Sequence, residues 1–218
     1  MKMNKILAMF LLCLAFSAKA QPVIKGGMES FITQNIIYPA YSYQNCVQGT
    51  INISFKLNKQ GEVYYSTVSS GPGIDLDDEA LRLIRLSSGK WKVPADYDST
   101  YVLIAPVNFK LASEDCNRVS QAEMNKAIAV YKANQGLTDA VTSFYKNKAK
   151  GKFTEAEEKR IIALKTELGY DDDYLNKKIK DGQQKLKQKD KQGACEDFLF
   201  VKYMGSSLAD GLLEKYCK

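Results

Sequence analysis

The chain has 218 residues, of which 45% are hydrophobic and 26% are charged, a composition typical of a folded globular protein. Its formal net charge is +6, and three of its lysines lie within the first twenty residues. In the rest of the chain, neither residues 21–112 nor residues 113–218 have the strong excess of basic residues typical of a nucleic-acid-binding protein. The sequence contains no histidine to activate a serine or cysteine. We therefore predict a protein that is not an enzyme, with no catalytic residue, metal site, cofactor or nucleic-acid partner.

Residues 1–20 have the pattern of a cleaved secretory signal peptide. Lys2 and Lys5 precede an apolar run from Ile6 to Phe16, and Ala18-Lys19-Ala20 fits a signal-peptidase site. The apolar run is about half as long as a bilayer span requires. We expect a mature chain that starts near Gln21, has no membrane span after cleavage, and is either located in the periplasm of the cell envelope or secreted.

The first domain, residues 21–112, is expected to begin with a short helix and a β-hairpin. The helix is predicted at Met28–Asn35, and Pro39 then favours extended chain. In Gly49–Val63 apolar and polar residues alternate, which buries one face of a strand and exposes the other. Asn58-Lys59-Gln60-Gly61 has the composition of the turn that closes the hairpin.

The returning strand and a second helix complete the cover of this hairpin. Val63 and Val68 have opposite parity, so a bulge must separate them if both face the core. Gly71-Pro72-Gly73 ends the strand, and acidic residues then crowd the first turn of a helix, where the helix dipole favours them. Its apolar stripe, which includes Leu76 and Ile84, is suited to covering the hairpin.

A third strand is predicted at Thr100–Leu111. Pro106 cannot donate a hydrogen bond to a neighbouring strand, so this strand is expected at an edge of the sheet. Val102 and Ile104 lie on the face opposite the core and need cover. In a simple meander the first and third strands run the same way, which separates Cys46 from Cys116 by roughly 33 Å. These two cysteines are therefore expected to stay unbridged.

The order of these elements resembles the C-terminal domain of TonB, the envelope energy transducer. The resemblance covers roughly Met28–Leu111, and the segments that carry it are Tyr38-Pro39, GTINISFKLNKQGEV, LDDEALRLI, GKWKVP and PVNFKL. It implies an α+β fold with a three-stranded antiparallel sheet and two helices. It also implies that the last strand accepts an extended peptide from an outer-membrane receptor by strand addition. Because Pro106 interrupts pairing, the docking edge is placed at Tyr101, Val102, Leu103, Ile104 and Ala105.

From residue 113 to residue 218 the pattern becomes helical and predicts an all-α array of helical hairpins. Ser120 with Glu123 and Thr154 with Glu157 form capping boxes, and Gly136 is expected to separate two helices. Helix pairs begin near Ser120, Thr154 and Asp190, steps of 34 and 36 residues, close to the ~34-residue period of tetratricopeptide repeats.

Cys195 and Cys217 are predicted to form a disulfide. An even number of cysteines in an exported chain favours disulfides over a metal site. The two cysteines lie near the start of one predicted helix and the end of the next, across a turn at Gly205–Ser207. The ends of an antiparallel helical hairpin meet, which brings the two sulfurs within reach.

Together these features predict an exported envelope protein with a TonB-like domain. Its partner is expected to be an outer-membrane receptor peptide or another envelope protein of outer-membrane transport, bound by strand addition. A structural scaffold is the alternative, in which the helical array mediates protein–protein interaction without energy transduction. A TonB transducer keeps its N-terminal anchor and a proline-rich linker, whereas this chain has a predicted cleavable signal and five prolines.

Overall fold

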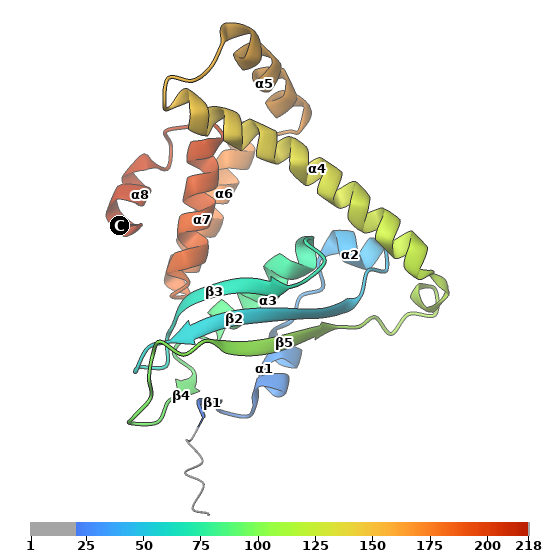
Figure 1. Ribbon diagram of the computed structural model, residues 1–218, viewed down its shortest axis with the longest axis vertical. Helices are drawn as coiled ribbons and strands as arrows, with labels where there is room; N and C mark the ends of the chain where they lie inside the picture. Colours follow the sequence, from blue (N-terminus) through green and yellow to red (C-terminus); the bar gives the residue numbers. More distant parts are fainter. Residues whose placement is uncertain (1–20, 218) are drawn as a thin grey trace, which may run out of the picture.

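The computed structural model describes residues 21–217, so the predicted signal peptide lies outside the described residues. Figure 1 shows two regions, a sheet accompanied by helices α1–α3 and a group formed by helices α5–α8. The long helix α4 connects the two regions. The strands are β1 (Val23–Ile24), β2 (Gly49–Leu57), β3 (Val63–Ser70), β4 (Trp91–Lys92) and β5 (Leu103–Phe109). The helices are α1 (Met28–Asn35), α2 (Ala40–Gln44), α3 (Asp75–Leu86), the short 3-10 segment η1 (Cys116–Arg118), α4 (Gln121–Lys148), α5 (Glu155–Glu167), α6 (Asp172–Lys187), α7 (Lys191–Tyr203) and α8 (Asp210–Tyr216).

The main sheet has the strand order β3-β2-β5, and β2 is antiparallel to both neighbours. The predicted alternation in β2 is present, with Ile51, Ile53 and Phe55 buried and the polar residues between them partly exposed. Leu76 and Ile84 of α3 pack against the buried face. The α+β class with a three-stranded antiparallel sheet, followed by helices, is confirmed. β1 and β4 form a separate two-stranded ribbon.

The hairpin between β2 and β3 has the predicted turn and the predicted bulge. Gly61 adopts φ 74°, a left-handed conformation that costs glycine little. Lys56 pairs with Tyr65 and Leu57 pairs with Val63, which leaves Tyr64 as the additional residue of β3. A bulge of this kind reverses the parity of the strand, and it allows both Val63 and Val68 to pack against the core.

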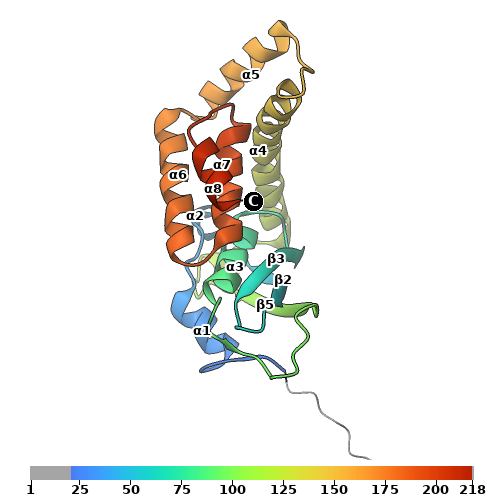
Figure 2. The same ribbon diagram turned by 90° about the vertical axis from the view of Figure 1, so that its left-hand side faces the viewer.

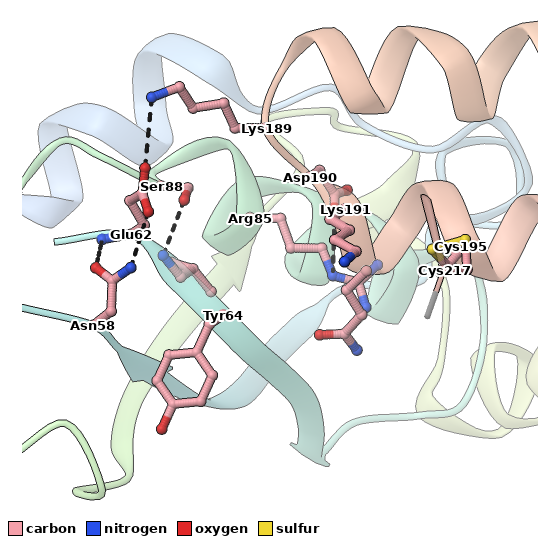
Figure 3. A pocket seen from close by; sticks show the side chains of 12 residues that line it. Asn58, Glu62, Tyr64, Arg85, Ser88, Lys189, Asp190, Lys191, Cys195 and Cys217 are labelled. Carbon is pink, nitrogen blue, oxygen red and sulfur yellow. Dashed lines mark hydrogen bonds and ion pairs between the residues drawn. A yellow bond between two sulfur atoms is a disulfide. The ribbon is translucent and has the colours of Figure 1, made fainter. Parts of the chain in front are cut away.

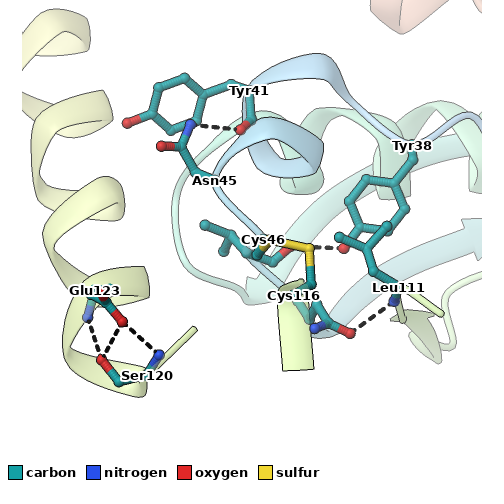
Figure 4. Close-up of a disulfide and its surroundings, with 10 residues drawn as sticks. Tyr38, Tyr41, Asn45, Cys46, Leu111, Cys116, Ser120 and Glu123 are labelled. Carbon is teal, nitrogen blue, oxygen red and sulfur yellow. Dashed lines mark hydrogen bonds between the residues drawn. A yellow bond between two sulfur atoms is a disulfide. The ribbon is translucent and has the colours of Figure 1, made fainter. Parts of the chain in front are cut away.

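The simple meander expected from the sequence is wrong. The chain crosses through α3 from β3 to the other side of β2, so β5 pairs with β2 and not with β3. Phe109 at the end of β5 is paired with Gly49 at the start of β2, which brings Cys46 and Cys116 to the same end of the sheet. They form a disulfide with Cα atoms 5.1 Å apart (Figure 4). The prediction that they stay unbridged is therefore also wrong.

Three helices, and not the two predicted, accompany the sheet. α1 has the predicted bounds, and α3 covers the hairpin as expected. The additional helix is α2, which begins directly after Pro39, where extended chain was expected. Pro39 stands at the N-cap with φ −64°, and a proline at the start of a helix removes no helical hydrogen bond.

The helical region begins with one unbroken helix, α4, where two were predicted. Ser120 and Glu123 form the predicted capping box, but Gly136 lies inside the helix and does not end it. A glycine in a helix costs about 1 kcal/mol. Packing offsets this cost, because α4 contacts one apolar cluster near the sheet through Ile128 and another in the helical region through Val141.

Helices α5 and α7 begin at the predicted positions, directly after Thr154 and Asp190. Thr154 and Glu157 form the second capping box, and the side chain of Asp171 caps α6. The predicted disulfide between Cys195 and Cys217 is confirmed, with Cα atoms 5.7 Å apart. α7 packs against α4, α6 and α8, while the tetratricopeptide-like character of the array stays a prediction. No helix within residues 21–217 is long and apolar enough to cross a membrane.

Candidate functional site

The outer edge of β5 is the candidate functional site. β5 pairs with β2 on one side, and no other strand of the described residues pairs with its free side (Figure 1). Pro106 faces Asn52 in this ladder. Since proline has no N–H, the two residues form a non-hydrogen-bonded pair, and antiparallel ladders alternate such pairs with hydrogen-bonded ones. The backbone N–H and C=O groups of Ile104 and Asn108, two residues on either side of Pro106, therefore point away from β2.

The opposite edge of the sheet, β3, is covered by the helical region. The N–H of Ser66 donates to Oε1 of Gln192 at 3.0 Å, and Nε2 of Gln192 donates to the carbonyl oxygen of Ser66 at 2.9 Å. The side-chain amide of Gln192, near the start of α7, thus takes the place of a neighbouring strand. Figure 2 shows α7 standing above α3 and the sheet. The outward backbone groups of Ser66 are therefore not available to an added strand.

A buried arginine fixes α7 in this position. Arg85 of α3 is 7% exposed and donates two hydrogen bonds of 2.8 Å to the carboxylate of Glu196. Its Nε also donates to Oγ of Ser66 at 2.9 Å and lies 3.8 Å from the buried carboxylate of Asp190. Burial raises the pKa of Asp190, while a hydrogen bond from the backbone of Gly193 and the charge of Arg85 oppose this shift. The arginine therefore compensates a buried negative charge at the contact between the two regions.

A cleft of about 530 Å³ lies beside this contact, between the hairpin turn and the start of α7 (Figure 3). Two pairs of its charged lining residues lie close together: Lys189 is 3.6 Å from Glu62, and Nε of Arg85 is 3.8 Å from Asp190. The disulfide of Cys195 lines the same cleft. These groups hold the helical region against the sheet, so we assign the cleft a structural role.

The five residues predicted to form the docking edge lie at the start of β5. Tyr101 and Val102 precede the strand, and Leu103, Ile104 and Ala105 are its first three residues. Tyr101, Val102 and Ile104 are 50%, 55% and 66% exposed. The side chains of Val102 and Ile104, for which the sequence predicts no cover within the domain, are therefore exposed in the structure. Leu103 and Ala105 face the core, and their backbone groups pair with β2.

A groove of about 560 Å³ runs along this edge. Its lining residues are Gln21, Pro22, Asp96, Tyr97, Asp98, Tyr101, Val102, Leu103 and Ile104. Four of the five predicted residues are therefore in the groove, and Ala105 is not. Sequence reasoning missed Asp96, Tyr97 and Asp98, because they lie in an irregular segment between β4 and β5 that has no periodic pattern.

Replacing Gln192 with alanine is expected to lower the free energy of unfolding by about 1–2 kcal/mol, because Ser66 loses two hydrogen-bond partners. The variant should also self-associate through the uncovered β3 edge. Denaturant titration and analytical ultracentrifugation measure these effects. Gln184→Ala, which changes an exposed glutamine of α6, is the matched control. A monomeric Gln192→Ala variant with unchanged stability would contradict the role given to Gln192.

These features define the first region as a small α+β domain whose sheet has one covered edge and one open edge. Residues 34–111 match the family model described as Gram-negative bacterial TonB protein C-terminal. The resemblance to this family predicted over Met28–Leu111 is therefore confirmed for this part of the chain. Comparison with curated proteins and with solved structures found no match.

Proposed function

We propose that the protein is an exported envelope protein that binds an extended segment of a partner by strand addition along Tyr101–Ala105. The observation that carries this proposal is the outward-facing N–H and C=O of Ile104, which lie beside the exposed side chains of Val102 and Ile104 in an open groove. Main-chain hydrogen bonds supply affinity in this mode of recognition, and pockets for alternate side chains supply specificity. The proposed partner is an outer-membrane receptor peptide or another envelope protein.

The two disulfides support export. Cys46–Cys116 and Cys195–Cys217 pair all four cysteines of the described residues. Such bonds form and persist in the bacterial periplasm and outside the cell, and are rare in the cytosol. They agree with the secretory signal proposed for residues 1–20 and with an envelope location for a TonB-like domain.

The register of β5 provides a sharp test of strand addition. Ile104→Pro removes the outward N–H in the docking segment and leaves every hydrogen bond to β2 in place. Asn108→Pro makes the same change at the same edge, outside the segment. Leu103→Pro is unsuitable because it removes a hydrogen bond to β2. The probe is a neutral peptide, acetyl-Gln-Val-Thr-Val-Thr-Val-Gln-amide, in which β-branched residues favour extended chain.

The neutral peptide is expected to shift the backbone amide NMR signals of Ile104 and its neighbours in the full-length chain. Ile104→Pro should weaken binding about tenfold, since a lost hydrogen bond costs about 1 kcal/mol and the ring adds a clash. Asn108→Pro should bind like the natural chain. Circular dichroism checks that both variants fold. Equal binding by both variants overturns the proposal, and shifts confined to α4–α8 would favour the scaffold alternative.

A further inference from the structure

The connection between α4 and α5 lies at the end of the molecule away from the sheet (Figure 1, Figure 2). It comprises residues 149–154, and every one of them is exposed. A β-carbon placed on Gly151 would meet no atom within 4 Å beyond the neighbouring residues. No other segment of residues 21–217 covers this turn, so its side chains are available to a partner.

This end of the molecule carries a run of lysines. The sequence of residues 146–153, KNKAKGKF, contains four lysines and no acidic residue. Lys150 and Lys152 are exposed, and their amino groups have no ion-pair partner in the part of the chain that the structure describes. The first turn of α5 adds three glutamates, of which Glu157 caps the helix and Glu158 pairs with Lys148. The free positive charges therefore outnumber the free negative ones.

Backbone hydrogen bonds fix the turn that carries these lysines. The N–H of Gly151 donates to the carbonyl of Lys148 at 2.9 Å, and the N–H of Lys152 donates to the carbonyl of Asn147 at 3.0 Å. Gly151 adopts φ 72°. This combination is the Schellman motif, which ends many helices. The turn therefore presents Lys150 and Lys152 from an ordered backbone.

An exposed aromatic side chain follows the lysines directly. Phe153 is 41% exposed, and its ring meets that of Phe144 edge to face, with centroids 6.3 Å apart. Nζ of Lys148 lies 5.1 Å from the centroid of the Phe153 ring. These contacts hold one side of the ring against the protein, and its other side is open to solvent.

Lysines beside an exposed aromatic ring match the chemistry of an anionic lipid surface. Each lysine close to such a surface adds to the affinity, and an aromatic ring is suited to the boundary between headgroups and acyl chains. The outer face of α6 also carries exposed lysines, at Lys177, Lys180 and Lys187, but no large apolar side chain of α6 is exposed. The combination of charge and apolar surface therefore favours the α4–α5 connection over α6.

We propose that the α4–α5 connection is a peripheral contact site for anionic lipid. Lys150 and Lys152 bind lipid phosphates, and the ring of Phe153 enters the headgroup region. The sheet then lies at the end of the molecule away from the lipid (Figure 1). This inference goes beyond the proposed docking at β5 and does not depend on it.

Vesicle co-sedimentation tests the role of charge. The probe protein is the chain from Gln21 to Lys218, which contains both cores and both disulfides and omits the apolar run of residues 6–16. It is expected to bind phosphatidylcholine vesicles that contain about 30% phosphatidylglycerol, and not vesicles of phosphatidylcholine alone. Salt at 0.5 M should release it, because salt screens exposed charges.

Two double variants with the same change in net charge locate the contact. Lys150→Gln with Lys152→Gln should weaken binding to the anionic vesicles about tenfold. Lys177→Gln with Lys180→Gln, on the exposed face of α6, should weaken it less than about twofold, since these lysines lie outside the proposed contact. Circular dichroism checks that both variants fold.

The phenylalanine is tested at constant charge. Phe153→Ser should weaken binding to the anionic vesicles about fivefold, whereas Val130→Ser, at a residue of α4 that is 48% exposed, should leave it unchanged. The fluorescence of Phe153→Trp should be quenched by lipids with brominated acyl chains. The natural chain should show no such quenching, because Trp91 lies in β4 at the other end of the molecule (Figure 1).

The contrary outcomes are specific. Failure to bind the anionic vesicles overturns the proposal, and so does a larger loss from the α6 variant than from Lys150→Gln with Lys152→Gln. Bound Phe153→Trp without quenching overturns the entry of the ring. Binding to soluble poly-glutamate and not to vesicles would identify an acidic protein as the partner and overturn the lipid assignment. None of these results alters the test of strand addition at β5, which uses the neutral peptide.

Discussion

Replacing both Cys46 and Cys116 with serine is expected to lower the free energy of unfolding by about 4 kcal/mol. A disulfide stabilises mainly by restricting the unfolded chain, and the effect grows with the length of the closed loop. This bond joins residues 70 positions apart. It ties the segment before β2 to the segment after β5 (Figure 4), at the end of the sheet where Gly49 pairs with Phe109.

Denaturant titration under oxidising conditions measures this loss. The matched comparison is the double variant Cys195→Ser, Cys217→Ser, which opens a loop of only 22 positions and should cost about 3 kcal/mol. The order of the two losses is as informative as their size. A larger loss for the shorter loop would show that local packing, and not restriction of the unfolded chain, dominates the stabilisation.

Arg85→Leu is expected to cost about 3 kcal/mol, because removing one partner of a buried ion pair leaves an uncompensated buried charge. The charge in question is Asp190, which is 6% exposed. Glu196, the other partner, is half exposed and can be solvated. Glu196→Gln should therefore cost less than about 1 kcal/mol. Urea titration of both variants at neutral pH measures this contrast.

The pH dependence of Arg85→Leu identifies the cause. The pKa of Asp190 is already raised by burial, and loss of the arginine raises it further. The folded state then binds a proton more tightly than the unfolded state, so stability is gained as the pH falls through the raised pKa toward about 4. The deficit of the variant should shrink over this interval. Asp190→Asn in the same chain, which preserves the helix cap, should recover part of it at neutral pH, and no recovery would contradict this explanation.

Short-range patterns predicted most elements of this fold. The alternation in β2 and the capping boxes are properties of neighbouring residues, and Pro106 alone marks an edge strand. Strand order could not be predicted in this way, because no local sequence pattern determines on which side of β2 the chain returns after α3. That error also produced the wrong prediction for Cys46. The prediction that Gly136 separates two helices failed for a related reason. The contacts that stabilise α4 as one helix come from residues distant in sequence.

The exposed apolar residues at the start of β5 were predictable from the sequence, and the groove beside them was not. Val102 and Ile104 stand out because apolar residues occupy both faces at the start of β5. Tyr97 and Asp98 belong to an irregular segment, and only folding places them beside that strand. The role of Gln192 could not be predicted from the sequence either, because there it is an ordinary polar residue in the first turn of a helix. Its role becomes visible only when its amide lies against the backbone of β3.

The unbroken course of α4 has a mechanical consequence. With 28 residues it extends for about 42 Å. Its first half is tied to the sheet region, where the hydroxyl of Tyr41 donates to the carbonyl of Ala127 at 2.6 Å, and its second half carries Val141 into the other core. The sheet region and the helical region are therefore joined by a continuous helix that packs into both cores. A force applied at β5 would be transmitted through the Cys46–Cys116 disulfide and α4 to the helical region.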